Sequence, residues 1–132
     1  MTTTCWGRRS KGDSPFRAYD TLHRAVDAGL DAIRPGVRCA ELFTAMAAAI
    51  EADGFSAGDV GRFGHGLGLQ LTEWPSHTPT DHTTLRPGMV ITLEPGLTIA
   101  PGCTMVHEED VVVVEHGAEL LSRRAPAELP II

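Results

Sequence analysis

The stretch Leu85-Arg-Pro-Gly-Met-Val-Ile-Thr-Leu-Glu-Pro-Gly96 holds a short apolar run between two Pro-Gly turns. Such turns around β-branched residues are typical of a strand, here residues 89–94. A second strand is predicted over residues 106–114, where four consecutive valines indicate burial on both faces. A turn at His116-Gly117 leads into a last short strand at residues 118–121. The C-terminal half of the chain is therefore expected to form a sheet.

Two helices precede these strands. Apolar residues recur at helical spacing over residues 16–33, directly after Pro15, which suits the first position of a helix. Pro35-Gly36 ends this first helix, and a second helix is predicted over residues 39–53. Helices followed by strands and loops indicate an α+β fold in which an antiparallel sheet packs on the two helices.

Length and composition narrow the class of protein. The chain has 132 residues, of which 42% are hydrophobic and 21% charged, as expected of a single soluble domain. A formal charge of −6 argues against a nucleic-acid partner. No apolar run suits a membrane span and the first residues do not resemble a signal peptide, so a cytoplasmic location is expected. Three widely separated cysteines are expected to be reduced thiols: Cys5, Cys39 and Cys103.

Three places carry residues suited to a metal site. His65 lies among glycines, Glu94 ends an apolar strand, and Glu108 begins the acidic run Glu108-Glu109-Asp110 that leads into the four valines. A carboxylate at the end of a buried strand is costly unless it is paired or bound to a cation, and imidazole with carboxylates suits Mn, Co, Fe or Zn. Simpler interpretations remain open: a turn histidine, a solvated strand end, and a charged edge that discourages aggregation.

The same three places resemble sequence blocks of a known family. Gly64-His-Gly-Leu-Gly-Leu-Gln-Leu-Thr-Glu-Trp-Pro75 is similar to the signature of the pita-bread metallopeptidases. Residues 85–96 and 108–117 resemble the next two blocks of that family, in the same order. The family includes methionine aminopeptidase, aminopeptidase P, prolidase and creatinase. The resemblance runs from about Phe16 onward and implies a partial pita-bread fold.

The resemblance implies roles for the three residues. His65 would bind one metal through its imidazole, and Glu108 would bridge two metals. Glu94 would bind metal and also act catalytically by helping to take a proton from water. The complete family site holds two divalent ions, which lower the pKa of water and stabilise charge on the attacked carbonyl.

Four departures from the family pattern change the expectation. The two aspartate ligands of the family would lie before or at Met1, and the separate N-terminal domain of many members has no counterpart here. Thr72 stands where the family often has histidine, and Val106 stands where Pro-specific peptidases have arginine. Residues 1–132 are therefore expected to be one N-terminally truncated catalytic domain that holds at most one ion, weakly, and has little or no activity alone.

The leading hypothesis is a metal-dependent hydrolase of the Xaa-Pro peptidase or aminopeptidase type, acting on a peptide or small amide. One alternative is a non-peptidase of the same fold, either a C–N hydrolase resembling creatinase or ectoine hydrolase, or a dimethylsulfoniopropionate lyase. The other is a catalytically inactive binding domain. Substrate contacts are predicted at Thr72, His82 and His107, and a homodimer is compatible with the family.

Overall fold

The computed structural model describes residues 15–58 and 60–132. Within these residues two helices are followed by seven short strands. Their bounds are α1 Pro15–Ala32, α2 Cys39–Ala52, β1 His65–Gly66, β2 Glu73–Ser76, β3 Val90–Leu93, β4 Gly96–Ala100, β5 Cys103–Val106, β6 Glu109–Val114 and β7 Gly117–Leu120.

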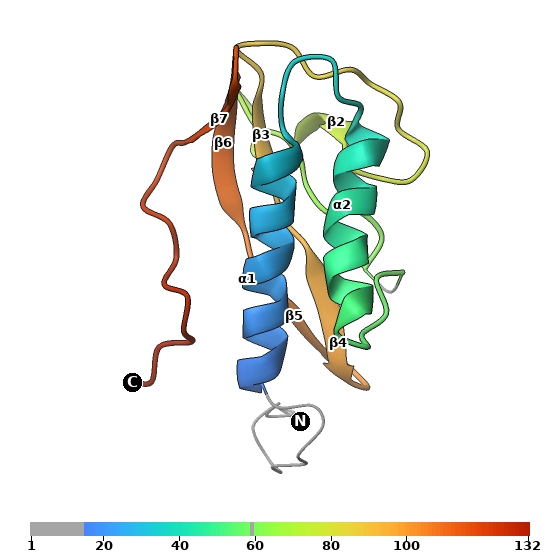
Figure 1. The fold of residues 1–132 in the computed structure, drawn as a ribbon, viewed down its shortest axis with the longest axis vertical. Helices are drawn as coiled ribbons and strands as arrows, with labels where there is room; N and C mark the ends of the chain where they lie inside the picture. Colours follow the sequence, from blue (N-terminus) through green and yellow to red (C-terminus); the bar gives the residue numbers. More distant parts are fainter. Residues whose placement is uncertain (1–14, 59) are drawn as a thin grey trace.

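Both predicted helices are confirmed to within a residue or two. They lie side by side and cover one face of the strands (Figure 1). At the start of α2 the Arg38 N–H donates to Glu41 Oε2 at 2.8 Å, which satisfies a free backbone donor next to the first turn. Gly54 follows the end of α2 with φ +85°, a conformation that favours glycine.

The main sheet has five strands in the order β2-β1-β3-β6-β7. All neighbouring pairs are antiparallel, and β3 meets β6 with Val90 opposite Val112. Strands β4 and β5 form a separate two-stranded sheet. The α+β fold with an antiparallel sheet packed on two helices is therefore confirmed.

The prediction of one strand over residues 106–114 is wrong. Val106 ends β5 in the smaller sheet, and β6 begins at Glu109 in the larger sheet. The chain changes sheet between them, where the His107 N–H donates to Pro95 O at 3.1 Å. Burial on both faces is also wrong, because Val111 and Val113 are buried whereas the alternate valines are only half-buried. Within the described chain the helices cover a single face of β6.

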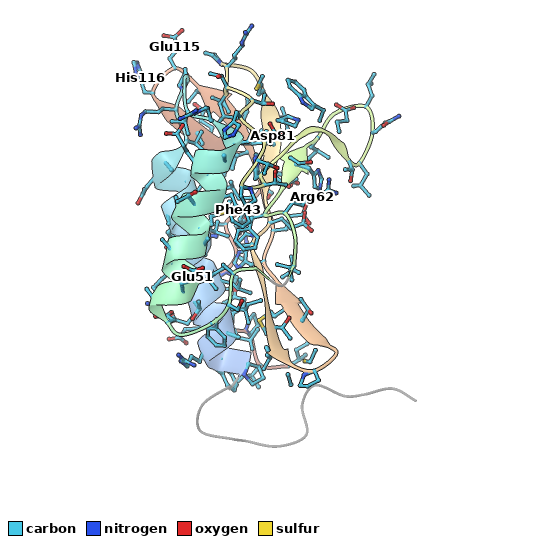
Figure 2. The ribbon with its side chains drawn as sticks, turned by 90° about the vertical axis from the view of Figure 1, so that its right-hand side faces the viewer. Phe43, Glu51, Arg62, Asp81, Glu115 and His116 are labelled. Carbon is cyan, nitrogen blue, oxygen red and sulfur yellow. The ribbon has the colours of Figure 1, made fainter. Side chains whose placement is uncertain are left out.

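The core lies between the helices and this face of the sheet. Phe43 points from α2 toward the strands (Figure 2), and its ring stacks on Phe63 at a centroid distance of 4.6 Å. Phe63 also anchors the loop before β1, because its N–H donates to His77 O and its carbonyl accepts from the Glu94 N–H. The helix layer is thus tied directly to the segments that carry His65 and Glu94. Fully buried large side chains include Leu22, Leu42, Met46, Ile50, Phe63, Ile91 and Leu93.

The cysteines differ from expectation at one position. Cys39 is a free, buried thiol, as predicted. Cys103 is disulfide-bonded, so the prediction of three reduced thiols is wrong. Cys5 lies outside the described residues. Wide separation of cysteines along the chain does not exclude that they are close in the folded protein. Neither described helix has the length and apolar character needed to span a membrane.

Candidate metal centre

His65, Glu94 and Glu108 converge on one point. Each offers a ligand atom, and these three atoms lie within 4.8 Å of one another. His65 comes from β1, Glu94 follows β3, and Glu108 lies between β5 and β6. The His65 Nε2 atom is 3.3 Å from Glu94 Oε2. An imidazole and two carboxylates at this spacing make a donor set suited to Mn, Co, Fe or Zn.

The backbone around His65 fixes the orientation of its ring. The His65 N–H donates to Thr92 Oγ1 at 3.1 Å, which ties β1 to β3. Its Nδ1 atom lies 2.8 Å from the Gly66 carbonyl oxygen, so Nδ1 carries the proton and donates. The other ring nitrogen, Nε2, faces the carboxylates and is the atom that lies close to Glu94 Oε2. With Nδ1 engaged by a carbonyl oxygen, Nε2 is the ring atom that is available to a metal.

Glycines on both sides of His65 let β1 fit between its neighbours. Gly64 has φ +132°, and a Cβ there would lie 2.1 Å from the Thr92 carbonyl oxygen. A Cβ on Gly66 would lie 2.2 Å from the Trp74 carbonyl oxygen. Real Cβ atoms do not approach this closely, so the glycines are required by close backbone contact.

The carboxylates of Glu94 and Glu108 lie close together and are accessible to solvent. Glu94 is fixed through its N–H, which donates to Phe63 O at 2.9 Å, and its side chain is 31% exposed. Burial raises the pKa of the Glu108 carboxyl, and the negative charges of Glu94 and Asp110 raise it further. A bound divalent cation would remove this repulsion between Glu94 and Glu108. The residues present therefore fit a metal ion.

The three ligands form one wall of a cavity of about 330 Å³. Arg62 also lines it and lies on the side of the strands away from the helices (Figure 2). Arg62 and the apolar lining residues were not predicted from the sequence. One signal was present: Leu71 follows the glycine cluster closely, and in the structure its side chain is 83% exposed. The remaining lining residues are Val60, Thr72, Gly96 and Val106.

The three predicted substrate contacts lie in different environments. Thr72 lines the cavity. His82 is exposed in the loop before β3 and is not among the residues that line the cavity. His107 is 6% exposed and lies behind the ligands, where its ring is 5.6 Å from that of Tyr19.

A buried polar cluster lies behind Glu108 and was not predicted. Glu109 is 3% exposed, and its Oε1 accepts from Arg124, from the Ala125 N–H and from His107. Burial acts to raise the pKa of Glu109, but these three hydrogen bonds and the Arg124 charge outweigh it and hold the pKa below its usual value. Glu109 is therefore a buried carboxylate with several partners.

Comparisons with known proteins agree with this geometry. The model of metallopeptidase family M24 matches residues 1–116. An Xaa-Pro dipeptidase of Pyrococcus furiosus is 33% identical over 114 residues, which are 86% of this chain and 33% of that protein. The structure of the dipeptidase PepE of Mycobacterium ulcerans matches with a TM-score of 0.79 and 37% identity, over 88% of this chain and 32% of that one.

A more distant structure shows the same fold. Methionine aminopeptidase of Rickettsia prowazekii matches with a TM-score of 0.68 at 21% identity, over 79% of this chain and 50% of that one. The expected pita-bread fold is thus confirmed for the described residues. The chain spans about a third of the length of the curated relatives that it matches. With its fold, its sequence blocks and the family model in agreement, the chain belongs to metallopeptidase family M24.

Proposed function

We propose that His65, Glu94 and Glu108 bind a divalent metal ion as part of a peptidase-type hydrolase site. The convergence of their three ligand atoms within 4.8 Å carries this proposal. The orientation of His65 supports it, since Nδ1–H is engaged by the Gly66 carbonyl oxygen and Nε2 is directed toward Glu94. Three protein ligands leave coordination positions open, as in catalytic rather than structural sites. Membership of a metallopeptidase family is consistent with divalent metal use.

Each residue of the site would have a separate role in hydrolysis. A divalent cation supplies polarisation of a substrate carbonyl and activation of water. Glu94 is partly exposed at the cavity wall, so its carboxylate is placed to take a proton from an attacking water. Glu108 would supply a second carboxylate ligand, and His65 would supply an imidazole ligand. Thr72 is placed to contact substrate from the facing loop.

We propose a peptide or small amide as the substrate. The Pyrococcus furiosus relative is an Xaa-Pro dipeptidase, and the PepE relative is a dipeptidase. A cavity of about 330 Å³ suits a ligand of a few residues. Val60, Leu71 and Val106 give it an apolar wall, which would favour an apolar side chain beside the amide. Homodimer formation and a cytoplasmic location stay predictions from the sequence.

Metal binding by the purified chain tests the proposal. After removal of metal with a chelator, dialysis against Mn²⁺ should load about one ion per chain, weakly, because three residues supply the protein ligands. Glu94→Gln and Glu108→Gln should each lower the amount bound. Glu51→Gln, on the outer side of α2 (Figure 2), is the matched control and should bind like the wild type.

Two results would contradict the proposal. One is a wild-type chain that binds no Mn²⁺ under conditions in which it is folded. The other is unchanged binding in both glutamine variants. Hydrolysis of an Xaa-Pro dipeptide by the metal-loaded chain, compared with a small non-peptide amide, then separates a peptidase from a C–N hydrolase. Metal binding without either reaction would favour a binding domain.

A further inference from the structure

We infer that Arg124 is a positioning residue that fixes the metal ligand Glu108 by anchoring its two neighbours, His107 and Glu109. This inference rests on the proposed metal site. It assigns a role to a C-terminal segment that forms no part of the cavity.

Burial alternates sharply around Glu108. His107 is 6% exposed and Glu109 is 3% exposed, whereas Glu108 is exposed at the cavity. Successive side chains of an extended chain point to opposite sides, so anchoring the two neighbours on the inner side directs the residue between them outward. The position of the Glu108 carboxylate therefore depends on what holds His107 and Glu109.

Arg124 holds these neighbours to helix α1. Its Nη1 donates to Glu109 Oε1 at 3.1 Å, and its Nη2 donates to Asp27 Oδ1 at 2.6 Å. Nη2 also donates to the His23 carbonyl oxygen at 3.1 Å. The His107 Nε2 atom is 3.1 Å from the same Glu109 oxygen. A rigid guanidinium with several donors can join three segments at once, which a lysine ammonium does with less geometric control.

The segment that carries Arg124 is itself fixed to α1. The Ala125 N–H donates to Glu109 Oε1 at 2.9 Å. The Tyr19 hydroxyl donates to the Pro126 carbonyl oxygen at 2.6 Å. The His107 ring lies 5.6 Å from the Tyr19 ring and 5.7 Å from the His23 ring. The backbone of the two residues after Arg124 and the Arg124 side chain are therefore both held, and this side chain is only 20% exposed.

Loss of the guanidinium would leave a buried carboxylate with too few partners. A charge in that situation is strongly unfavourable, so Glu109 would turn toward water and move the adjoining backbone. Metal ligands tolerate little displacement, and loss of the partners that orient them typically weakens metal binding by about 10- to 100-fold. Replacement of Arg124 is therefore expected to weaken metal binding, although Arg124 is not one of the three metal ligands.

A Co²⁺ titration of the full chain, followed by visible absorption, tests this. Arg124→Met should raise the dissociation constant for Co²⁺ by about 10- to 100-fold and alter the absorption bands, which report ligand geometry. Arg124→Lys should restore part of the affinity, because it returns one charged donor to Glu109. Arg123→Met is the matched control: it removes the same charge from an exposed neighbour and should leave affinity and bands unchanged.

A second variant guards against misfolding. Glu109→Gln keeps the side-chain volume and an acceptor oxygen but weakens the charge-assisted bonds, and it should raise the dissociation constant several-fold. If folded Arg124→Met or Glu109→Gln binds Co²⁺ with wild-type affinity and wild-type bands, and only the melting temperature falls, Arg124 is merely structural and the inference is overturned. Absence of Co²⁺ binding by the wild-type chain would instead overturn the proposed metal site, and this inference with it.

Discussion

A buried histidine beside the site should make the stability of the fold depend on pH. His77 is fully buried; its Nε2–H donates to the Thr92 carbonyl oxygen at 2.9 Å, and its Nδ1 finds no partner among the described residues. Burial lowers the pKa of His77 from 6.5 to about 4, because the charged ring would lose its hydration. The hydrogen bond to the Thr92 carbonyl oxygen acts in the opposite direction, but the effect of burial is larger.

The sign of the effect follows from these two pKa values. The folded state has the lower pKa, so on acidification the unfolded chain takes up the proton first and unfolding is favoured. The contribution of His77 is fully present above about pH 6.5 and is lost as the pH falls toward about 4. With these values, the free energy of unfolding should fall by about 2 kcal/mol between about pH 7.5 and about pH 5 from His77 alone.

Urea unfolding at these two pH values measures the effect. His77→Gln keeps a side-chain N–H near the position of Nε2 but cannot take up a proton, so its loss of stability on acidification should be smaller by about 2 kcal/mol. His116→Gln changes an exposed turn residue and should retain the wild-type pH dependence (Figure 2). Equal losses in the wild type and His77→Gln would refute the reasoning.

Three further outcomes can be checked with single substitutions. Ile91→Ala removes a fully buried side chain and should lower the free energy of unfolding by about 2–5 kcal/mol, whereas Leu69→Ala, fully exposed, should change it by less than about 0.5 kcal/mol in urea titrations. Gly64→Ala should cost roughly 1–3 kcal/mol more than Gly102→Ala, because both have positive φ but only the first new Cβ overlaps backbone. Burial raises the pKa of Cys39 to about 12, so iodoacetamide at mildly alkaline pH should label it only after unfolding, and rapid native labelling would contradict this.

Local patterns were enough to predict most of the secondary structure. The helical period and Pro15 placed α1, and Pro-Gly turns on both sides placed β3. The prediction of one strand over residues 106–114 failed because the chain leaves the smaller sheet after Val106 and enters the larger sheet at Glu109. A change of sheet depends on pairing partners elsewhere in the chain, which periodicity does not report.

Local sequence patterns also indicated the three candidate metal ligands, but not the residues that surround them. His65, Glu94 and Glu108 became candidates because they lie beside turns and strand ends. The family resemblance then implied that the three residues belong to one metal site. The buried surroundings of His107 were not predictable, because its partners lie on α1 and in the last segment of the chain. Nothing in the sequence around Arg124 indicates that it meets Glu109 and Asp27, a meeting that depends on tertiary packing.

The central claim is that one divalent ion is shared by His65, Glu94 and Glu108. Crystals of the chain grown with Zn²⁺ would give anomalous scattering that locates the metal directly. We expect one strong peak at about 2.0–2.2 Å from His65 Nε2 and from an oxygen of each glutamate. A peak elsewhere, or three side chains that turn away from one another with no metal between them, would contradict the account.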